Sequence, residues 1–173
     1  MGNGRFDLRV AWALEPGERE PVGRVRSMRQ RGEDLGLRLY GALHELAMDY
    51  FLVAAVGSDH PTLSVSLVHR AFDKLSTGGD VVLGPAADGG YYLVAVSSEA
   101  LSERLFRRIP WSTAGVLEST LDRCRELDLK VDLLPTVADV DTPTDLAHLI
   151  ATLDRDPAVG GRRTRSLLRS WNR

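Results

Sequence analysis

Apolar residues recur along this chain with two different periods, one typical of strands and one typical of helices. Strands are predicted where apolar residues alternate or form short continuous runs, at residues 7–14, 51–56, 80–84, 91–96 and 130–134. Helices are predicted where apolar residues recur every three or four positions, at residues 33–48, 65–75, 99–106 and 113–127. The run 51–56 is apolar throughout, so we expect a central strand that is covered on both faces. Strands separated by helices predict an α/β fold with a mostly parallel sheet and helices on both faces.

The ends of the predicted elements carry their own signals. Residues 15–31 combine proline, glycine and charge without a clear period, which predicts a loop. Ser112 or Thr113 is expected to cap the helix that follows. The last helix is predicted to start at Thr142, with Pro143 in its first turn and Asp145 placed to return a capping bond. Three signals coincide at this last boundary, which makes it the most sharply defined.

Composition and charge favour one domain followed by a distinct tail. The chain has 173 residues, 43% of them hydrophobic, which suits a single α/β domain over residues 1–159. Residues 160–173 hold five arginines and no acid, so removing those arginines from the net charge of −2 leaves −7 for the rest. An acidic body argues against binding of nucleic acid. We expect the tail to be disordered; the alternative is a short amphipathic helix that meets an acidic partner or an anionic membrane.

Cysteine use and hydropathy indicate the cellular setting. The single cysteine, Cys124, cannot form an internal disulfide and falls on the apolar stripe of a predicted helix, so we expect it in the core. No apolar run approaches the roughly 20 residues that a membrane span needs, and the N-terminus has no hydrophobic signal region. The sequence therefore predicts a cytoplasmic protein without a membrane span.

Three acidic clusters carry the candidate chemistry, and each follows a predicted strand. In open α/β sheets, ligands bind at the carboxyl ends of the strands. The first cluster comprises Gly57, Ser58, Asp59 and His60, where the glycine permits a sharp turn. Mg²⁺ is bound through one or two carboxylates plus substrate phosphates, so Asp59 is the first candidate ligand. The alternative is that Asp59 only caps the turn before the next helix, and His60 is interpreted as a solvated loop residue.

The second cluster contains Asp88, Gly89 and Gly90 just before Tyr91. Two adjacent glycines permit unusual backbone conformations and allow a ligand to approach main-chain N–H groups closely. Asp88 could then bind a ribose, a sugar hydroxyl or an incoming nucleophile. The alternative is a glycine-rich turn that only connects two strands.

The third cluster places Asp139 and Asp141 on either side of a valine, just before a predicted helix. In an extended segment both carboxylates face the same side, because the side-chain period is two. They could share a cation. Helix capping is the alternative explanation for one of them.

Four motifs together resemble those of a bacterial family of glycosyltransferase-like proteins. They are GSDHP (57–61), LGPAADGGYYLV (83–94), IPWST (109–113) and DVDTPTDL (139–146). The upstream segment RQRGEDLGLRL (29–39) also resembles the family, which is similar to the guanylyltransferases that build molybdopterin and phospholactate cofactors. The resemblance implies a nucleotide-diphosphosugar transferase-like fold and a transferase that uses a nucleotide sugar or a nucleoside triphosphate.

The resemblance also implies roles for individual residues. Asp59 and Asp88 would be catalytic, and Mg²⁺ or Mn²⁺ would be held by Asp59, Asp139 and Asp141. The remaining positions would bind the nucleotide or nucleotide-sugar substrate: Gly57, Ser58, Gly89, Gly90, Tyr91 and Arg38. Such a cation would neutralise the charge that develops on the leaving phosphate oxygens.

One part of the family pattern is absent from residues 1–31. Family members open with an apolar strand and a glycine- and proline-containing loop that bears Lys and Arg and contacts the nucleotide. That strand would lie between the strands predicted at 7–14 and 51–56, so these two are expected to pair directly or to receive a strand from another chain, as in a homodimer. The alternative to an active transferase is therefore an inactive binding or regulatory module, or a fragment of a longer enzyme.

Overall fold

The computed structural model describes residues 6–21, 23–156 and 161–171, and its centre is a four-stranded sheet. The strand order is β3 (Leu52–Val56), β5 (Tyr91–Ser97), β4 (Val81–Pro85) and β6 (Val131–Leu133). β4 pairs parallel with β6, whereas β5 is antiparallel to both β3 and β4. Three strands therefore share one direction and β5 is reversed. The predicted α/β fold is confirmed.

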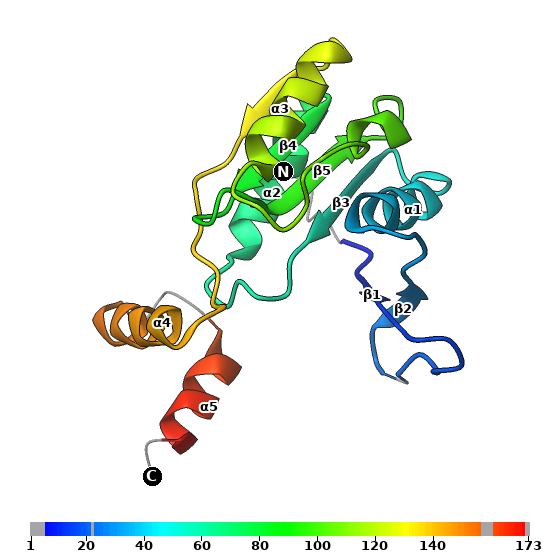
Figure 1. Cartoon of the computed structure of the whole chain (residues 1–173). Helices are drawn as coiled ribbons and strands as arrows, with labels where there is room; N and C mark the ends of the chain where they lie inside the picture. The colour runs from blue at the N-terminus through cyan, green and yellow to red at the C-terminus, as the bar shows by residue number, and fades with distance from the viewer. Residues whose placement is uncertain (1–5, 22, 157–160, 172–173) are drawn as a thin grey trace.

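Helices cover both faces of this sheet (Figure 1). On one face, α1 (Leu35–Ala47), the short 3-10 helix η1 (Glu103–Leu105) and α3 (Val116–Glu126) contribute Leu43, Leu105 and Cys124 to a core with Val81 and Val94. On the other face, α2 (Val65–Ser76) packs through Ala71 and Leu75 against Val82, Leu93 and Ala95. Successive residues of β4 and β5 alternate between the two cores, as the two-residue strand period requires. Cys124 is fully buried as expected, and burial raises the pKa of its thiol to about 11.

A second, smaller sheet consists of β1 (Arg9–Trp12) and β2 (Arg26–Arg29), which pair parallel to each other. Residues 15–31 were predicted as a loop, which was wrong for β2. Only Met28 of this strand is buried, so the strand shows no hydrophobic period in the sequence. The small sheet lies below α1 in Figure 1 and does not pair with β3. The direct pairing expected between the strands at 7–14 and 51–56 is therefore wrong. In the described part of the chain, β3 is an edge strand and not a central one.

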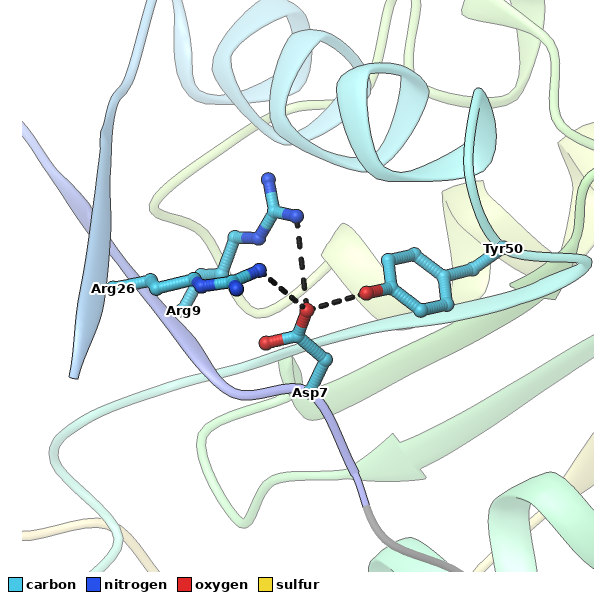
Figure 2. A network of polar contacts seen from close by, with 4 residues as sticks. All are labelled: Asp7, Arg9, Arg26 and Tyr50. Carbon is cyan, nitrogen blue, oxygen red and sulfur yellow. Dashed lines mark hydrogen bonds and ion pairs between the residues drawn. The ribbon is translucent and has the colours of Figure 1, made fainter.

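A polar network ties the small sheet to the larger body (Figure 2). Tyr50, in the connection between α1 and β3, donates its hydroxyl hydrogen bond to the carboxylate of Asp7. The same carboxylate oxygen lies 3.7 Å from the guanidinium of Arg9 and 3.3 Å from that of Arg26. The hydrogen bond from Tyr50 lowers the pKa of Asp7, and both arginines add to the effect. Just before Asp7, the ring of Phe6 packs beside aromatic rings of α2.

Helix boundaries follow the sequence signals only in part. The helix predicted at 99–106 is reduced to η1, and α3 begins after Gly115 without a side-chain cap. Thr113 accepts a hydrogen bond from the Gly115 N–H, so it belongs to the turn before the helix. The capping box at Thr142 is confirmed: Thr142 caps α4 (Pro143–Arg155), and Asp145 accepts from the Thr142 N–H at 2.8 Å.

The C-terminal segment forms a helix, α5 (Arg162–Trp171), where we expected disorder. Its order comes from contacts with the end of α4. The guanidinium of Arg165 donates to the backbone carbonyls of Leu153 and Asp156, which satisfies acceptors that a helix end leaves free. Among the residues described, no helix combines the length and apolar character that crossing a bilayer would demand.

Candidate functional site

The three acidic clusters converge beside the ends of β3, β4 and β6. Asp59 follows β3, and Asp88 follows β4. The backbone N–H of Val140, between Asp139 and Asp141, donates to the carbonyl of Asp59 at 3.2 Å. A parallel bridge between Ala86 and Val137 joins the segments that lead to the second and third clusters. Since β3, β4 and β6 run in one direction, their carboxyl ends meet at one edge of the sheet, where a ligand site is expected.

The carboxylates of all three clusters lie close enough to influence the ionisation of Asp141. Partial desolvation raises the pKa of Asp141, and the negative charges of Asp139, Asp59, Asp88 and Asp145 raise it further. No lysine or arginine among the described residues forms an ion pair with Asp59, Asp88, Asp139 or Asp141. The edge therefore concentrates negative charge that no lysine or arginine of the described chain pairs with.

Asp59 is positioned by the two residues around it. Its Oδ1 lies 2.7 Å from Nδ1 of His60, and a Cβ on Gly57 would come within 2.8 Å of the same oxygen. The His60 side chain is only 6% exposed, and its ring centroid lies 5.6 Å from that of Tyr92. Our interpretation of His60 as solvated was therefore wrong, because the turn at Gly57 folds the imidazole back onto the sheet. The N-cap of α2 is Ser64, so Asp59 does not cap that helix.

The second cluster is a tight turn that packs against the start of α3. Asp88 accepts a hydrogen bond from the Gly90 N–H at 2.8 Å, and Gly89 has a φ of 91°. A Cβ on Gly89 would lie 2.3 Å from the carbonyl oxygen of Ala114, and the Leu117 N–H donates to the Gly89 carbonyl at 2.9 Å. The glycine at position 89 is thus required by both backbone conformation and close approach. Asp88 itself is exposed.

Two of the predicted substrate-binding side chains, those of Tyr91 and Arg38, make contacts within the protein itself. The ring of Tyr91 belongs to the partly buried shell of the core and meets Trp111 edge-on at 6.2 Å. Burial strongly raises the pKa of its hydroxyl. Arg38, in α1, donates from Nε to the carbonyl of Gly32 at 3.1 Å and so supports the loop before that helix. Ser58 is exposed beside Asp59.

The third cluster borders a pocket that sequence reasoning missed. The helix cap is Thr142, so capping accounts for neither Asp139 nor Asp141. Asp139, Asp145 and His148 line a pocket of about 350 Å³ beside α4, together with Thr62. The spacing of three between Asp145 and His148 places both on one helix face, which was the available signal.

Comparison with known proteins places the fold in a class. A solved structure of a protein provisionally described as a nucleotide-diphospho-sugar transferase, from Desulfovibrio desulfuricans G20, matches with a TM-score of 0.71 and 31% identity. The match covers 79% of this chain and 62% of that one, so the chain spans less than two thirds of that relative. A CMP:2-keto-3-deoxy-manno-octonic acid synthetase complexed with CTP matches with a TM-score of 0.52 and 15% identity, over 76% of this chain and 73% of that one. No curated protein matches.

The fold is thus that of nucleotidyl- and glycosyltransferase-like α/β proteins. The chain belongs to the family described as "Uncharacterized protein conserved in bacteria (DUF2064)", whose profile matches residues 5–113. That range includes the first two acidic clusters, whereas Asp139 and Asp141 lie beyond it. The bacterial family expected from the motifs is confirmed at this level.

Proposed function

We propose that this protein is a metal-dependent transferase that uses a nucleotide sugar or a nucleoside triphosphate. One observation carries the proposal: Asp59, Asp88, Asp139 and Asp141 share one sheet edge, where the charges of the other three help to raise the pKa of Asp141. Carboxylates that lie close together without a lysine or arginine partner are suited to a cation. The transferase-like fold of the two solved neighbours supports the same reading.

The residue types at this edge suit a hard cation such as Mg²⁺ or Mn²⁺. Asp59, Asp139 and Asp141 would hold it, because carboxylate oxygens are the ligands that these ions take in proteins. In the described ranges, no three acidic, histidine or cysteine side chains already lie where they would grip a metal ion. When bound, such a cation neutralises charge on the phosphate oxygens of the donor.

The protein groups around the cation divide the remaining tasks. The Asp59 carboxylate lies 2.7 Å from Nδ1 of the buried His60 side chain, and the lack of a side chain at Gly57 leaves room for it. Asp88 is exposed on a turn anchored to α3, where it can orient an acceptor hydroxyl and accept its proton. Gly89 and Gly90 bring backbone close to the same place without side-chain bulk. One neighbour was solved in complex with CTP, which makes a nucleotide the first donor to test.

Calorimetric titration tests this function directly. The chain is titrated with GTP, UDP-glucose and GDP-mannose, each with and without Mg²⁺ or Mn²⁺. We expect metal-dependent binding of one of them, and we expect Asp59→Asn and Asp141→Asn each to weaken it by about tenfold or more. Asp73→Asn is the matched control, because Asp73 is exposed on α2 away from the clusters. Equal binding by all three variants would refute the site.

A second candidate function is an inactive binding or regulatory module. The separation of the β1–β2 sheet from β3 favours it, because the edge of β3 beside the site lacks a strand partner among the described residues. In that case the chain binds a nucleotide but transfers nothing from it. Incubation with donor, metal and candidate acceptor alcohols, followed by mass spectrometry of the products, separates the two functions.

A further inference from the structure

Helix α5 presents an apolar and basic stripe that the rest of the described structure leaves uncovered. Leu167 and Trp171 are 51% and 61% exposed, and Arg163 is exposed one turn before Leu167. Residues four apart lie on one face of a helix, so these three side chains form a continuous line along α5. The exposed tryptophan and leucine lie one turn apart and form a local apolar patch on a ten-residue helix.

The contact between α5 and α4 fixes which way the stripe faces. Arg165 donates to the carbonyls of Leu153 and Asp156 at the end of α4. Arg165 is separated from Leu167 by about 160° around the helix, since successive residues are about 100° apart in projection. The stripe therefore points away from α4. Figure 1 shows α5 as the outermost element at the C-terminal end, clear of both sheets.

The charges of the C-terminal segment identify the kind of partner. Five arginines and no acid occur in residues 160–173, whereas the rest of the chain carries −7. A second copy of α5 would bring arginines against arginines, which disfavours pairing of the two stripes. An anionic surface with an apolar interior satisfies both features, because arginine pairs with phosphate while leucine and tryptophan enter the boundary below the headgroups.

We propose that α5 docks the protein onto an anionic lipid surface. Leu167 and Trp171 enter the interface, Arg163 pairs with lipid phosphates, and Arg165 keeps the helix fixed to α4. The remaining arginines contribute attraction at longer range. This surface is separate from the acidic edge, and the proposal does not depend on the transferase function.

Vesicle co-sedimentation tests the proposal. The full chain is mixed with phosphatidylcholine vesicles that contain or lack phosphatidylglycerol. We expect binding only to the anionic vesicles. We expect the double variant Leu167→Ser/Trp171→Ser to lower the partition coefficient by about tenfold or more, and Arg163→Gln to lower it by about fivefold. Met48→Ser/Val65→Ser and Arg70→Gln are matched controls, since they remove exposed side chains of the same kinds from α2 and the end of α1.

Three results would overturn the proposal. The first is absence of binding to anionic vesicles by a chain whose circular dichroism shows that it is folded. The second is equal loss of binding in the α5 variants and their controls, which would indicate attraction without a specific site. The third is self-association in sedimentation velocity, or capture by polyglutamate or RNA in preference to vesicles, that the Leu167→Ser/Trp171→Ser variant abolishes. That result would identify another partner for the stripe.

Discussion

The turn at Gly89 offers a sharp test of how the candidate site is built, by comparison of two glycine substitutions. Gly89 and Gly78 both have positive φ, at 91° and 102°. They differ in their surroundings. A Cβ on Gly89 would meet the Ala114 carbonyl oxygen at 2.3 Å, whereas a Cβ on Gly78 would have nothing within 4 Å. Gly78→Ala therefore measures backbone strain alone, and Gly89→Ala measures strain plus the close approach to α3.

The expected magnitudes follow from this difference. An alanine in the left-handed region costs about 1–2 kcal/mol, and the reduced entropy of the unfolded chain returns about 0.4–1 kcal/mol at either position. The contact at Gly89 is with backbone, which cannot rotate away, so accommodation costs about a further 1–3 kcal/mol. We therefore expect Gly89→Ala to lower the free energy of unfolding by about 1–3 kcal/mol more than Gly78→Ala.

Urea unfolding followed by circular dichroism measures both free energies, provided that the m-values stay equal. Gly89→Ala should also weaken any metal-dependent nucleotide binding, because Asp88 precedes the displaced residue. Gly78→Ala lies in the turn after α2 and should leave that binding unchanged. If the two variants lose equal stability, the packing of the turn against Ala114 contributes nothing and our account of the double glycine is wrong.

Three further predictions concern charge and strand pairing. Asp141→Asn should raise the melting temperature at neutral pH, because the raised folded-state pKa of Asp141 means that its charge destabilises the folded protein. The gain should vanish at a pH below both the folded and the unfolded pKa values. An unchanged melting temperature would contradict the repulsion. The pKa of Asp145 shifts in the opposite direction, because hydrogen bonds with Thr142 lower it. The stability that ionised Asp145 contributes is therefore present above about pH 4 and is lost as the pH falls through the folded-state pKa. Acid titrations of native protein and Asp145→Asn should therefore converge at low pH. Just after β3, the Gly57 N–H donates to the carbonyl of Tyr92 on β5, so along β3 the amides face β5 and the open edge alternately. Hydrogen exchange resolved by NMR should therefore be slow at odd-numbered and fast at even-numbered residues of β3. Uniform protection would show that the edge is covered.

The features that sequence reasoning predicted are those set by local or short-range patterns. The apolar runs of β4 and β5 are buried on both faces, so their pattern survives any arrangement of neighbours. The capping box at Thr142 depends on three nearby residues and forms as expected. The convergence of Asp59, Asp88 and Asp141 follows from strand direction alone, since each of them comes after a strand of the same sense.

The features that it missed depend on partners distant in the sequence. β2 carries two arginines and a single buried residue, so nothing but its pairing with β1 marks it as a strand. β3 has the composition of a central strand, yet its position at an edge is decided by which strand lies beside it. His60 is buried because its ring packs against Tyr92, which lies on another strand. α5 is ordered by one arginine that reaches two carbonyls at the end of α4.

The acidic edge is difficult to explain by the needs of the fold alone. The helices that follow the first and third clusters are capped by Ser64 and Thr142, so neither Asp59 nor Asp141 is required at a helix start. No lysine or arginine of the described residues pairs with these carboxylates, and their proximity disfavours the ionised form of Asp141. Removing that charge should therefore stabilise the isolated chain. A group that lowers the stability of the free protein but would be stabilised by a bound cation is what a metal-dependent binding edge requires. Asp141→Asn separates the two roles in one variant, since it should raise the melting temperature without metal and weaken the binding of nucleotide with metal.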